Sequence, residues 1–167
     1  MEKIVLIGFA CCGKSTVGKI LADKIAYRFV DTDCEIERRS NLTVAEIFER
    51  FGENKFRQME NELLRELVDN NTVVACGGGS VLTDNFDTFV QNSAIVWLTA
   101  TAQTVRERLT DSIPRPLFDK LSVGQLQEYI SLRTPIYAKY ARVQIATDGK
   151  TPEQVAEEIY NKIISKE

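Results

Sequence analysis

Two kinds of apolar segment alternate along the chain: short runs typical of buried strands, and longer stretches in which apolar residues recur at helical spacing. After the first run, for example, Val17, Ile20, Leu21 and Ile25 share one helical face. The short runs predict strands at residues 3–7, 27–30, 72–76, 93–98 and 143–146. This order predicts an α/β fold: a doubly wound, five-stranded parallel sheet with helices on both faces. No linker or repeat divides it, so residues 1–167 are expected to form a single domain.

Local signals predict several helix boundaries. Residues 43–46 and 122–125 each fit a capping box, which marks the start of a helix. Gly52 is expected to end the first of these helices, and a longer helix should follow it. We also expect one helix over 82–90, and a kink or restart at Pro135.

Residues 8–16 fit the phosphate-binding motif G-x-x-x-x-G-K-[ST]. A strand precedes the motif and a helix follows it, so a chance match on a glycine turn is the less favoured interpretation. Gly8 and Gly13 allow the close backbone approach of a phosphate, Lys14 supplies a positive charge, and the Ser15 hydroxyl can reach Mg²⁺. The candidate ATP-binding residues of this loop are Cys11, Cys12, Gly13, Lys14, Ser15 and Thr16.

Further candidate site residues follow the second and third strands. Asp31 and Asp33 lie two residues apart, and if both belong to the strand they face one cleft at its carboxyl end. The alternative is that they only close the strand and cap the next helix. The run Gly77–Gly79 would let a ligand lie against bare backbone, although a flexible loop without a ligand is also open.

Two arginines have ambiguous roles at this level. Arg57 and Glu60 lie three residues apart on a helix, where a surface ion pair is a simpler interpretation than a grip on a substrate anion. Residues 110–118 contain two prolines with Arg115 between them. This segment suits either a mobile lid that carries a positive charge over phosphates or an ordinary surface loop.

Charge and hydropathy exclude some functions. The net charge of −3 and the absence of a basic block argue against nucleic-acid binding, and no apolar run is long enough to span a membrane. The sequence passes from Met1 directly into the first strand, so we expect no signal peptide and a cytoplasmic location.

The four cysteines do not have the spacing of a zinc site, and we interpret them as small buried residues. Cys11 and Cys12 differ because a helix N-terminus lowers thiol pKa, which makes the loop a candidate for alkylation against which ATP protects. The chain has no histidine, so a general base must be a carboxylate, Lys, Tyr or Cys.

A phosphate loop does not identify the second substrate, and three classes compete. A GTP-driven switch needs N-K-x-D, but residues 54–57 lack the aspartate and no D-x-x-G occurs. A motor or binding-only ATPase usually has a later strand that ends in Asp, whereas this one ends at Cys76. A small phosphoryl-transfer enzyme fits better: one of Asp31 and Asp33 would position Mg²⁺ and the other an acceptor hydroxyl.

Six motifs in order across residues 3–164 resemble those of shikimate kinases, which have the fold of nucleoside monophosphate kinases. The motifs are the loop at 8–18, Asp31-Thr32-Asp33, Gly52-Glu53 with Phe56-Arg57 and Glu60, Gly77–Gly79, Arg115-Pro116-Leu117, and Arg133-x-Pro135-x-Tyr137. The resemblance implies transfer of the ATP γ-phosphate to the 3-hydroxyl of shikimate, with Mg²⁺ as cofactor, in aromatic amino acid biosynthesis. Gluconate kinases share the loop and core and are the nearest rivals. We expect a monomer.

The resemblance also implies roles for single residues. Arg57 and Arg133 would grip the shikimate carboxylate, Glu60 would hold Arg57, and Gly77–Gly79 would line the same pocket. Asp33 would bind the acceptor hydroxyl as base or orienting group, and together with Lys14 and Arg115 it would form the catalytic set.

Other implied roles concern the nucleotide. Asp31 would take the outer Mg²⁺ position, with the Ser15 hydroxyl reaching the ion. Arg108 and Pro152 would enclose the adenine. A substrate-binding segment is expected near 34–62, and a lid near 110–120. Cys11 departs from the pattern because the family usually has glycine there, and Cys76 stands where Ser or Thr is common.

Overall fold

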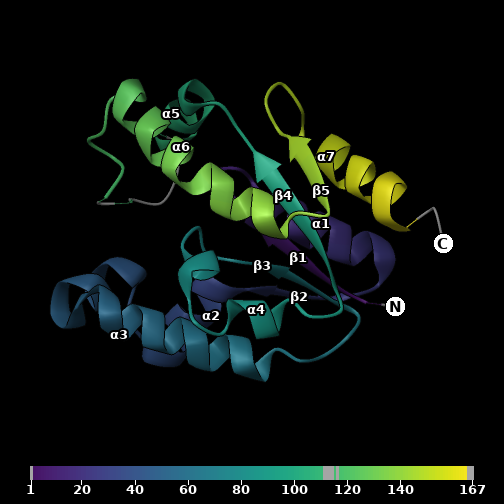
Figure 1. Cartoon of the computed structure of the whole chain (residues 1–167), viewed down its shortest axis with the longest axis horizontal. Helices are drawn as coiled ribbons and strands as arrows, with labels where there is room; N and C mark the ends of the chain where they lie inside the picture. Colours follow the sequence, from purple (N-terminus) through teal and green to yellow (C-terminus); the bar gives the residue numbers. More distant parts are fainter. Residues whose placement is uncertain (1, 111–114, 116, 165–167) are drawn as a thin grey trace.

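Parallel strands form the centre of the computed structural model (Figure 1), which describes residues 2–110, 115 and 117–164. Within these ranges the sheet has five strands in the spatial order β2-β3-β1-β4-β5, and every neighbouring pair is parallel. The strands are β1 (Lys3–Ile7), β2 (Arg28–Asp31), β3 (Thr72–Ala75), β4 (Ser93–Thr99) and β5 (Val143–Ala146). The predicted fold is therefore confirmed.

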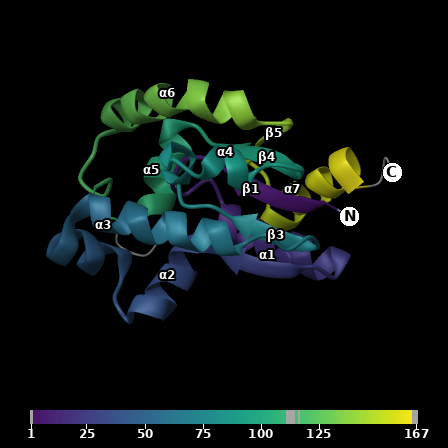
Figure 2. The same cartoon turned by 60° about the horizontal axis from the view of Figure 1, so that its bottom comes forward.

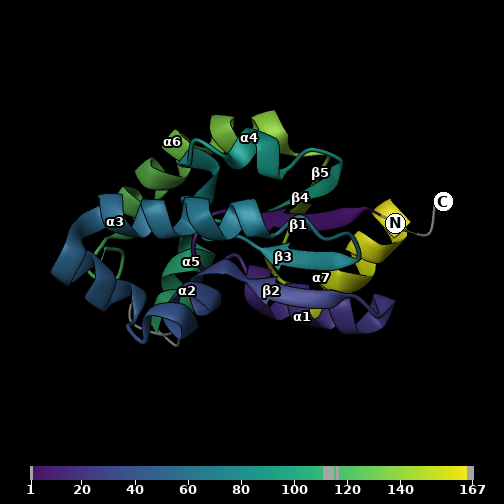
Figure 3. The same cartoon turned by 90° about the horizontal axis from the view of Figure 1, so that it is seen from below.

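Helices cover both faces of this sheet. They are α1 (Lys14–Ile25), α2 (Thr32–Ser40), α3 (Val44–Glu66), α4 (Phe86–Phe89), α5 (Ala102–Thr110), α6 (Val123–Tyr140) and α7 (Pro152–Ile159), with short turns η1 (Ser80–Leu82) and η2 (Tyr160–Ile164). Figure 3 shows α3, α4 and α6 on one face and α1 with α7 on the other, and Figure 2 shows the sheet between α6 and α1. None of the helices in the described ranges is long and apolar enough to cross a membrane.

Most predicted helix boundaries agree with the structure. Thr43 and Ser122 both form complete capping boxes, and Gly52 interrupts α3 with non-helical angles (φ 81°, ψ 171°). One prediction was wrong: the segment 82–90 is not one helix, because η1 and α4 share it. Of the two alternatives at Pro135, a restart is excluded, because α6 continues through Pro135 to Tyr140.

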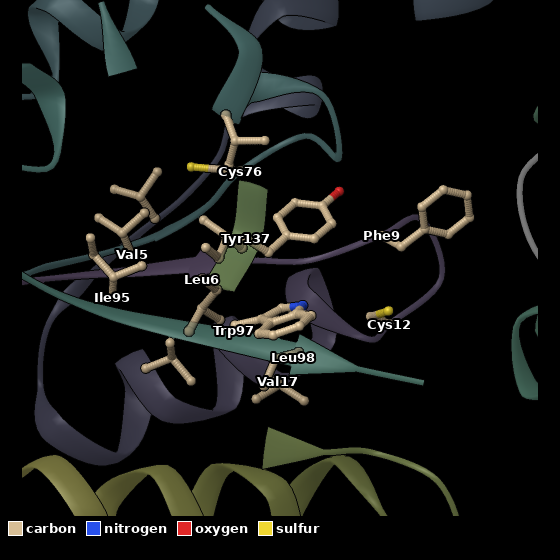
Figure 4. Packing of buried hydrophobic residues seen from close by; sticks show 14 of the residues in the cluster. Val5, Leu6, Phe9, Cys12, Val17, Cys76, Ile95, Trp97, Leu98 and Tyr137 are labelled. Atoms are coloured by element: carbon tan, nitrogen blue, oxygen red, sulfur yellow. The ribbon is translucent and has the colours of Figure 1, made fainter. Parts of the chain in front are cut away.

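The core lies between the sheet and its helices. Figure 4 shows Val5 of β1 beside Ile95 of β4, and Trp97 of β4 beside Tyr137 of α6. Trp97 is a core residue, and its ring centroid lies 5.9 Å from that of Tyr137.

Three candidate site segments lie at the carboxyl ends of neighbouring strands. The phosphate loop follows β1, Asp31 ends β2, and the triple glycine follows β3. Because parallel strands share their direction, these three segments meet at their carboxyl ends, which is where open α/β sheets bind ligands.

Candidate active site

The phosphate loop has the backbone conformation that the motif requires. Gly8 has φ 145°, and a Cβ there would overlap the carbonyl oxygen of Leu98 on the neighbouring strand. Gly13 is left-handed (φ 87°) and directs the chain into α1. Glycine is the residue that adopts both conformations without a steric cost.

The Lys14 side chain folds back over the loop. Its Nζ donates hydrogen bonds to the carbonyl oxygens of Gly8 (2.7 Å) and Phe9 (2.8 Å). Burial lowers the pKa of this ammonium group from its ordinary value. The lysine is therefore already in the loop, where a phosphate oxygen can replace the two carbonyl partners.

The two loop cysteines have different environments. Cys11 is left-handed (φ 59°), half-buried and on the cavity wall, so a non-glycine residue occupies a position that favours glycine. Cys12 is buried, and that burial raises its pKa more than the nearby positive charges of Lys14 and Arg108 lower it. The prediction of a lowered pKa is wrong for Cys12. The prediction of buried thiols holds for Cys12 and Cys76, whereas Cys34 is exposed.

Asp31 and Asp33 both reach the cavity, although not through strand alternation as predicted. Asp31 ends β2 and caps α2, accepting a hydrogen bond from the Cys34 N–H (3.0 Å). Its other oxygen, Oδ2, accepts a short hydrogen bond from the Ser15 hydroxyl. Asp33 belongs to the first turn of α2. The capping alternative therefore describes Asp31 correctly, but it does not exclude Asp31 from the site.

Asp33 is the carboxylate with the more perturbed environment. Its Oδ1 is buried and has no hydrogen-bond partner among the described residues. Burial, followed by the negative charges of Asp31 and Glu60, raises its pKa from 3.8 to about 6, although Arg115 and Lys14 oppose the rise. An unpartnered carboxylate oxygen with such a pKa suits a group that accepts a proton near neutral pH.

Each residue of the triple glycine faces a different side chain. A Cβ on Gly77 would lie 2.6 Å from Asp33 Oδ1, and a Cβ on Gly79 would overlap the guanidinium of Arg57. The carbonyl oxygen of Gly78 accepts hydrogen bonds from Arg133 Nη1 (3.0 Å) and from the Tyr137 hydroxyl (2.6 Å). These glycines therefore bring α2, α3 and α6 together at one edge of the sheet.

Arg57 and Glu60 form an ion pair that is not on the surface. Glu60 is only 1% exposed, so the interpretation as a solvated pair is wrong. Arg57 Nη1 donates to Glu60 Oε2, and Arg57 Nη2 lies 3.4 Å from Glu53 Oε1. The arginine is thus held by two carboxylates on its own helix while its guanidinium lies beside Gly79.

Two more arginines lie near the phosphate loop. Arg108 donates through Nη1 to the Cys11 carbonyl oxygen (3.0 Å) and to the Thr147 hydroxyl (3.0 Å), joining the phosphate loop to the segment after β5. The Nε of Arg115 is buried and has no partner among the described residues. The Arg115 N–H donates to Asp119 Oδ2 (2.7 Å). Residues 111–114 and 116 of the predicted lid lie outside the described residues.

A cavity of about 250 Å³ joins these groups. The predicted site residues that line it are Cys11, Gly13, Lys14, Ser15, Thr16, Asp31, Asp33, Gly77, Gly78, Arg108 and Arg115. Cys12, Arg57, Glu60, Gly79, Arg133 and Pro152 are not part of its lining. Arg57 and Arg133 still adjoin it through the triple glycine, whereas Pro152 begins α7.

Sequence reasoning assigned no role to three groups that organise this site. The Thr32 hydroxyl accepts a hydrogen bond from the Gly77 N–H (2.9 Å), Tyr137 bonds to Gly78, and the Ser80 hydroxyl donates to Glu60 Oε1 (2.7 Å). Thr32 and Tyr137 lie inside recognisable motifs. Nothing in the sequence marks Ser80.

A phosphate loop, an unpartnered carboxylate and converging arginines on a parallel α/β sheet define a P-loop phosphotransferase for a small acceptor. The family model for shikimate kinase matches residues 10–164. A shikimate kinase of Persephonella marina is 39% identical over 165 residues, covering 98% of this chain and 99% of that protein. The chain therefore belongs to the shikimate kinase family, the ATP-dependent kinases of aromatic amino acid biosynthesis.

Solved structures agree with this family. A shikimate kinase from Acinetobacter baumannii, solved in complex with shikimate, aligns with a TM-score of 0.92 and 31% identity over 100% of this chain and 95% of that chain. A gluconokinase from Sinorhizobium meliloti aligns with a TM-score of 0.57 and 19% identity, covering 94% and 88% of the two chains. The second likeness is one of fold alone.

Proposed function

We propose that this chain transfers the γ-phosphate of ATP to the 3-hydroxyl of shikimate, with the reacting groups placed between Lys14, Asp33 and Arg115. One observation carries the proposal. The two buried polar atoms without partners in the described residues, Asp33 Oδ1 and Arg115 Nε, belong to residues that line the same cavity as the phosphate loop. One is an acceptor suited to a hydroxyl proton, and the other is a donor suited to a phosphate oxygen.

The nucleotide side uses the loop and its lysine. The N–H groups of Gly13, Ser15 and Thr16 lie at the start of α1, where backbone donors and the helix dipole favour anions. Lys14 exchanges its two carbonyl partners for phosphate oxygens. Arg108 and Pro152 are proposed to enclose the adenine, because Arg108 already bridges the loop and the segment that leads to Pro152.

Mg²⁺ is the proposed cofactor, with Ser15 and Asp31 as its protein groups. Their hydroxyl and carboxylate oxygens are hydrogen-bonded to each other and line the cavity, and hard oxygen donors are what this ion prefers. An ion of this kind usually keeps several waters and takes further ligands from substrate phosphates, so few protein ligands are needed. When bound, the ion neutralises charge on the transferred phosphoryl group.

The acceptor side uses α3, α6 and the triple glycine. Arg57 of α3 lies beside Gly79, and Arg133 of α6 bonds to the neighbouring Gly78. A carboxylate bound between them can accept hydrogen bonds from both guanidinium groups. Asp33, beside Gly77, orients the acceptor hydroxyl and takes its proton as the phosphoryl group is transferred. Residues 34–62 form the proposed substrate-binding segment and 110–120 the proposed lid, within one domain that we propose acts as a cytoplasmic monomer.

The direct test is a phosphorylation assay with shikimate and gluconate side by side, on the wild type and on Lys14→Ala. We expect turnover of shikimate only, and its loss in Lys14→Ala. Lys19→Ala, an exposed position on the same helix, is the matched control and should retain normal turnover. Faster turnover of gluconate would contradict the acceptor assignment, and normal turnover by Lys14→Ala would contradict the phosphate-loop assignment.

A further inference from the structure

The side chain of Ser80 lies directly behind the proposed acceptor site. Ser80 begins η1, immediately after the triple glycine, and is 0% exposed. Its hydroxyl donates a hydrogen bond of 2.7 Å to Oε1 of Glu60, which is itself 1% exposed. This hydrogen bond therefore joins two buried polar side chains, one from η1 and one from α3.

Glu60 is held at both of its oxygens. Oε1 accepts from Ser80, and Oε2 accepts from Arg57 Nη1. Because both oxygens of the carboxylate accept hydrogen bonds, the group is held against rotation. Its orientation toward the Arg57 guanidinium is therefore fixed. Without the Ser80 hydroxyl, Oε1 would be a buried acceptor with no donor, and such a group is costly enough to drive rearrangement.

The same atoms surround one point of the backbone. A Cβ on Gly77 would lie 3.1 Å from Glu60 Oε1, 3.3 Å from the Ser80 hydroxyl oxygen and 2.6 Å from Asp33 Oδ1. The Ser80 hydroxyl has one proton, and it donates that proton to Glu60. The neighbouring Asp33 Oδ1 consequently keeps its acceptor capacity for the substrate.

We propose that Ser80 is a positioning residue for shikimate binding: through Glu60 it sets the orientation of the Arg57 guanidinium. This inference rests on the proposed contact between Arg57 and the substrate carboxylate. Ser80 itself does not touch the substrate. Its removal should therefore affect the use of shikimate and leave the use of ATP unchanged.

The test compares Ser80→Ala with Thr83→Val. Thr83 belongs to the same turn, and its hydroxyl donates to the Ser80 carbonyl oxygen (2.7 Å) without reaching Glu60, so Val removes a hydrogen bond of the same turn. We expect Ser80→Ala to raise the KM for shikimate about tenfold, the effect of losing one hydrogen bond to a charged group. The KM for ATP and kcat should stay near the wild-type values. Thr83→Val should leave all three constants unchanged.

A double-mutant cycle with Arg57→Ala distinguishes the role of Ser80 from the contact between Arg57 and the substrate. If Ser80 acts through Arg57, Ser80→Ala should cause no further loss of kcat/KM for shikimate in the Arg57→Ala background. An additive loss, or an equal rise of both KM values in Ser80→Ala, would overturn the role of Ser80. An unchanged KM for shikimate in Arg57→Ala alone would instead overturn the contact proposed above.

Discussion

Asp33 of α2 and Glu60 of α3 place carboxylate oxygens beside the same residue, Gly77, where a Cβ would lie 2.6 Å from Asp33 Oδ1 and 3.1 Å from Glu60 Oε1. The two acids have different surroundings. Glu60 is bonded at both oxygens, whereas Asp33 Oδ1 has no partner in the described part of the chain. The charge of Glu60 contributes to the raised pKa of Asp33, after burial and Asp31. Within the described residues, one carboxylate is thus hydrogen-bonded at both oxygens, and the other keeps an oxygen that can accept a hydrogen bond.

Asp33→Asn should lower kcat for shikimate phosphorylation by about 100-fold, the scale of a lost general base. In the wild type, kcat/KM should fall as pH drops through about 6, because Asp33 then becomes protonated and cannot accept the hydroxyl proton. The measurement is a pH profile from 5 to 9. Asp23→Asn, at an exposed position on α1, is the control and should keep the wild-type profile. An unchanged kcat in Asp33→Asn would remove Asp33 from the acceptor site.

The same substitution should stabilise the unliganded protein. The folded-state pKa of Asp33 is raised from 3.8 to about 6, so the folded protein binds this proton more tightly than the unfolded chain does. The stability that the protonated carboxyl contributes is therefore fully present below pH 3.8 and is lost as pH rises through 6. At pH 8 we expect Asp33→Asn to raise the free energy of unfolding by about 1–3 kcal/mol, and at pH 4 by much less. Urea titrations at the two pH values measure the difference. Equal effects at both would show that the folded-state pKa is not raised.

Arg57→Ala should raise the KM for shikimate by about 100-fold, since a charge-assisted hydrogen bond to the substrate contributes about 3 kcal/mol. The KM for ATP should change less than twofold. Arg65→Ala is the matched control, because Arg65 is exposed on the same helix and lies outside the proposed substrate-binding segment. Initial rates with each substrate varied in turn provide both constants. A parallel rise in both would indicate a folding defect instead of a lost contact.

Iodoacetamide should inactivate the enzyme through Cys11, with ATP protecting it. Cys11 is half-buried and lines the cavity, whereas burial raises the thiol pKa of both Cys12 and Cys76, and the pKa of Cys34 is raised to about 11. Cys11→Ser should therefore resist inactivation, and Cys34→Ser should behave as the wild type does. Peptide mass spectrometry locates the label. Inactivation of Cys11→Ser at the wild-type rate would contradict this assignment.

The fold and the phosphate loop could be predicted because each depends on local sequence. Apolar runs define the strands, and Gly8, Gly13 and Lys14 belong to one contiguous motif whose residue types indicate its backbone conformation. The segment 82–90 was harder to predict because its apolar spacing also suits a short turn followed by a short helix.

The residues proposed to bind the acceptor could be predicted only in part. Their environment depends on burial, and the spacing of residues in the sequence does not reveal burial. Arg57 and Glu60 have the spacing of a surface pair, yet Glu60 is buried beside Gly77 and Ser80. Strand alternation predicts that Asp33 faces the cleft, but Asp33 lies in the first turn of helix α2. At Cys12, burial likewise outweighs the nearby positive charges of Lys14 and Arg108, so the thiol pKa is raised.

The central claim is that Arg57 and Arg133 hold the acceptor's carboxylate beside the triple glycine while the phosphate loop holds the nucleotide. The most direct measurement is a crystal structure of the protein with ADP, Mg²⁺ and shikimate bound. The account predicts the shikimate carboxylate within hydrogen-bond distance of both guanidinium groups and the 3-hydroxyl beside Asp33 Oδ1. A carboxylate bound away from both arginines would contradict it.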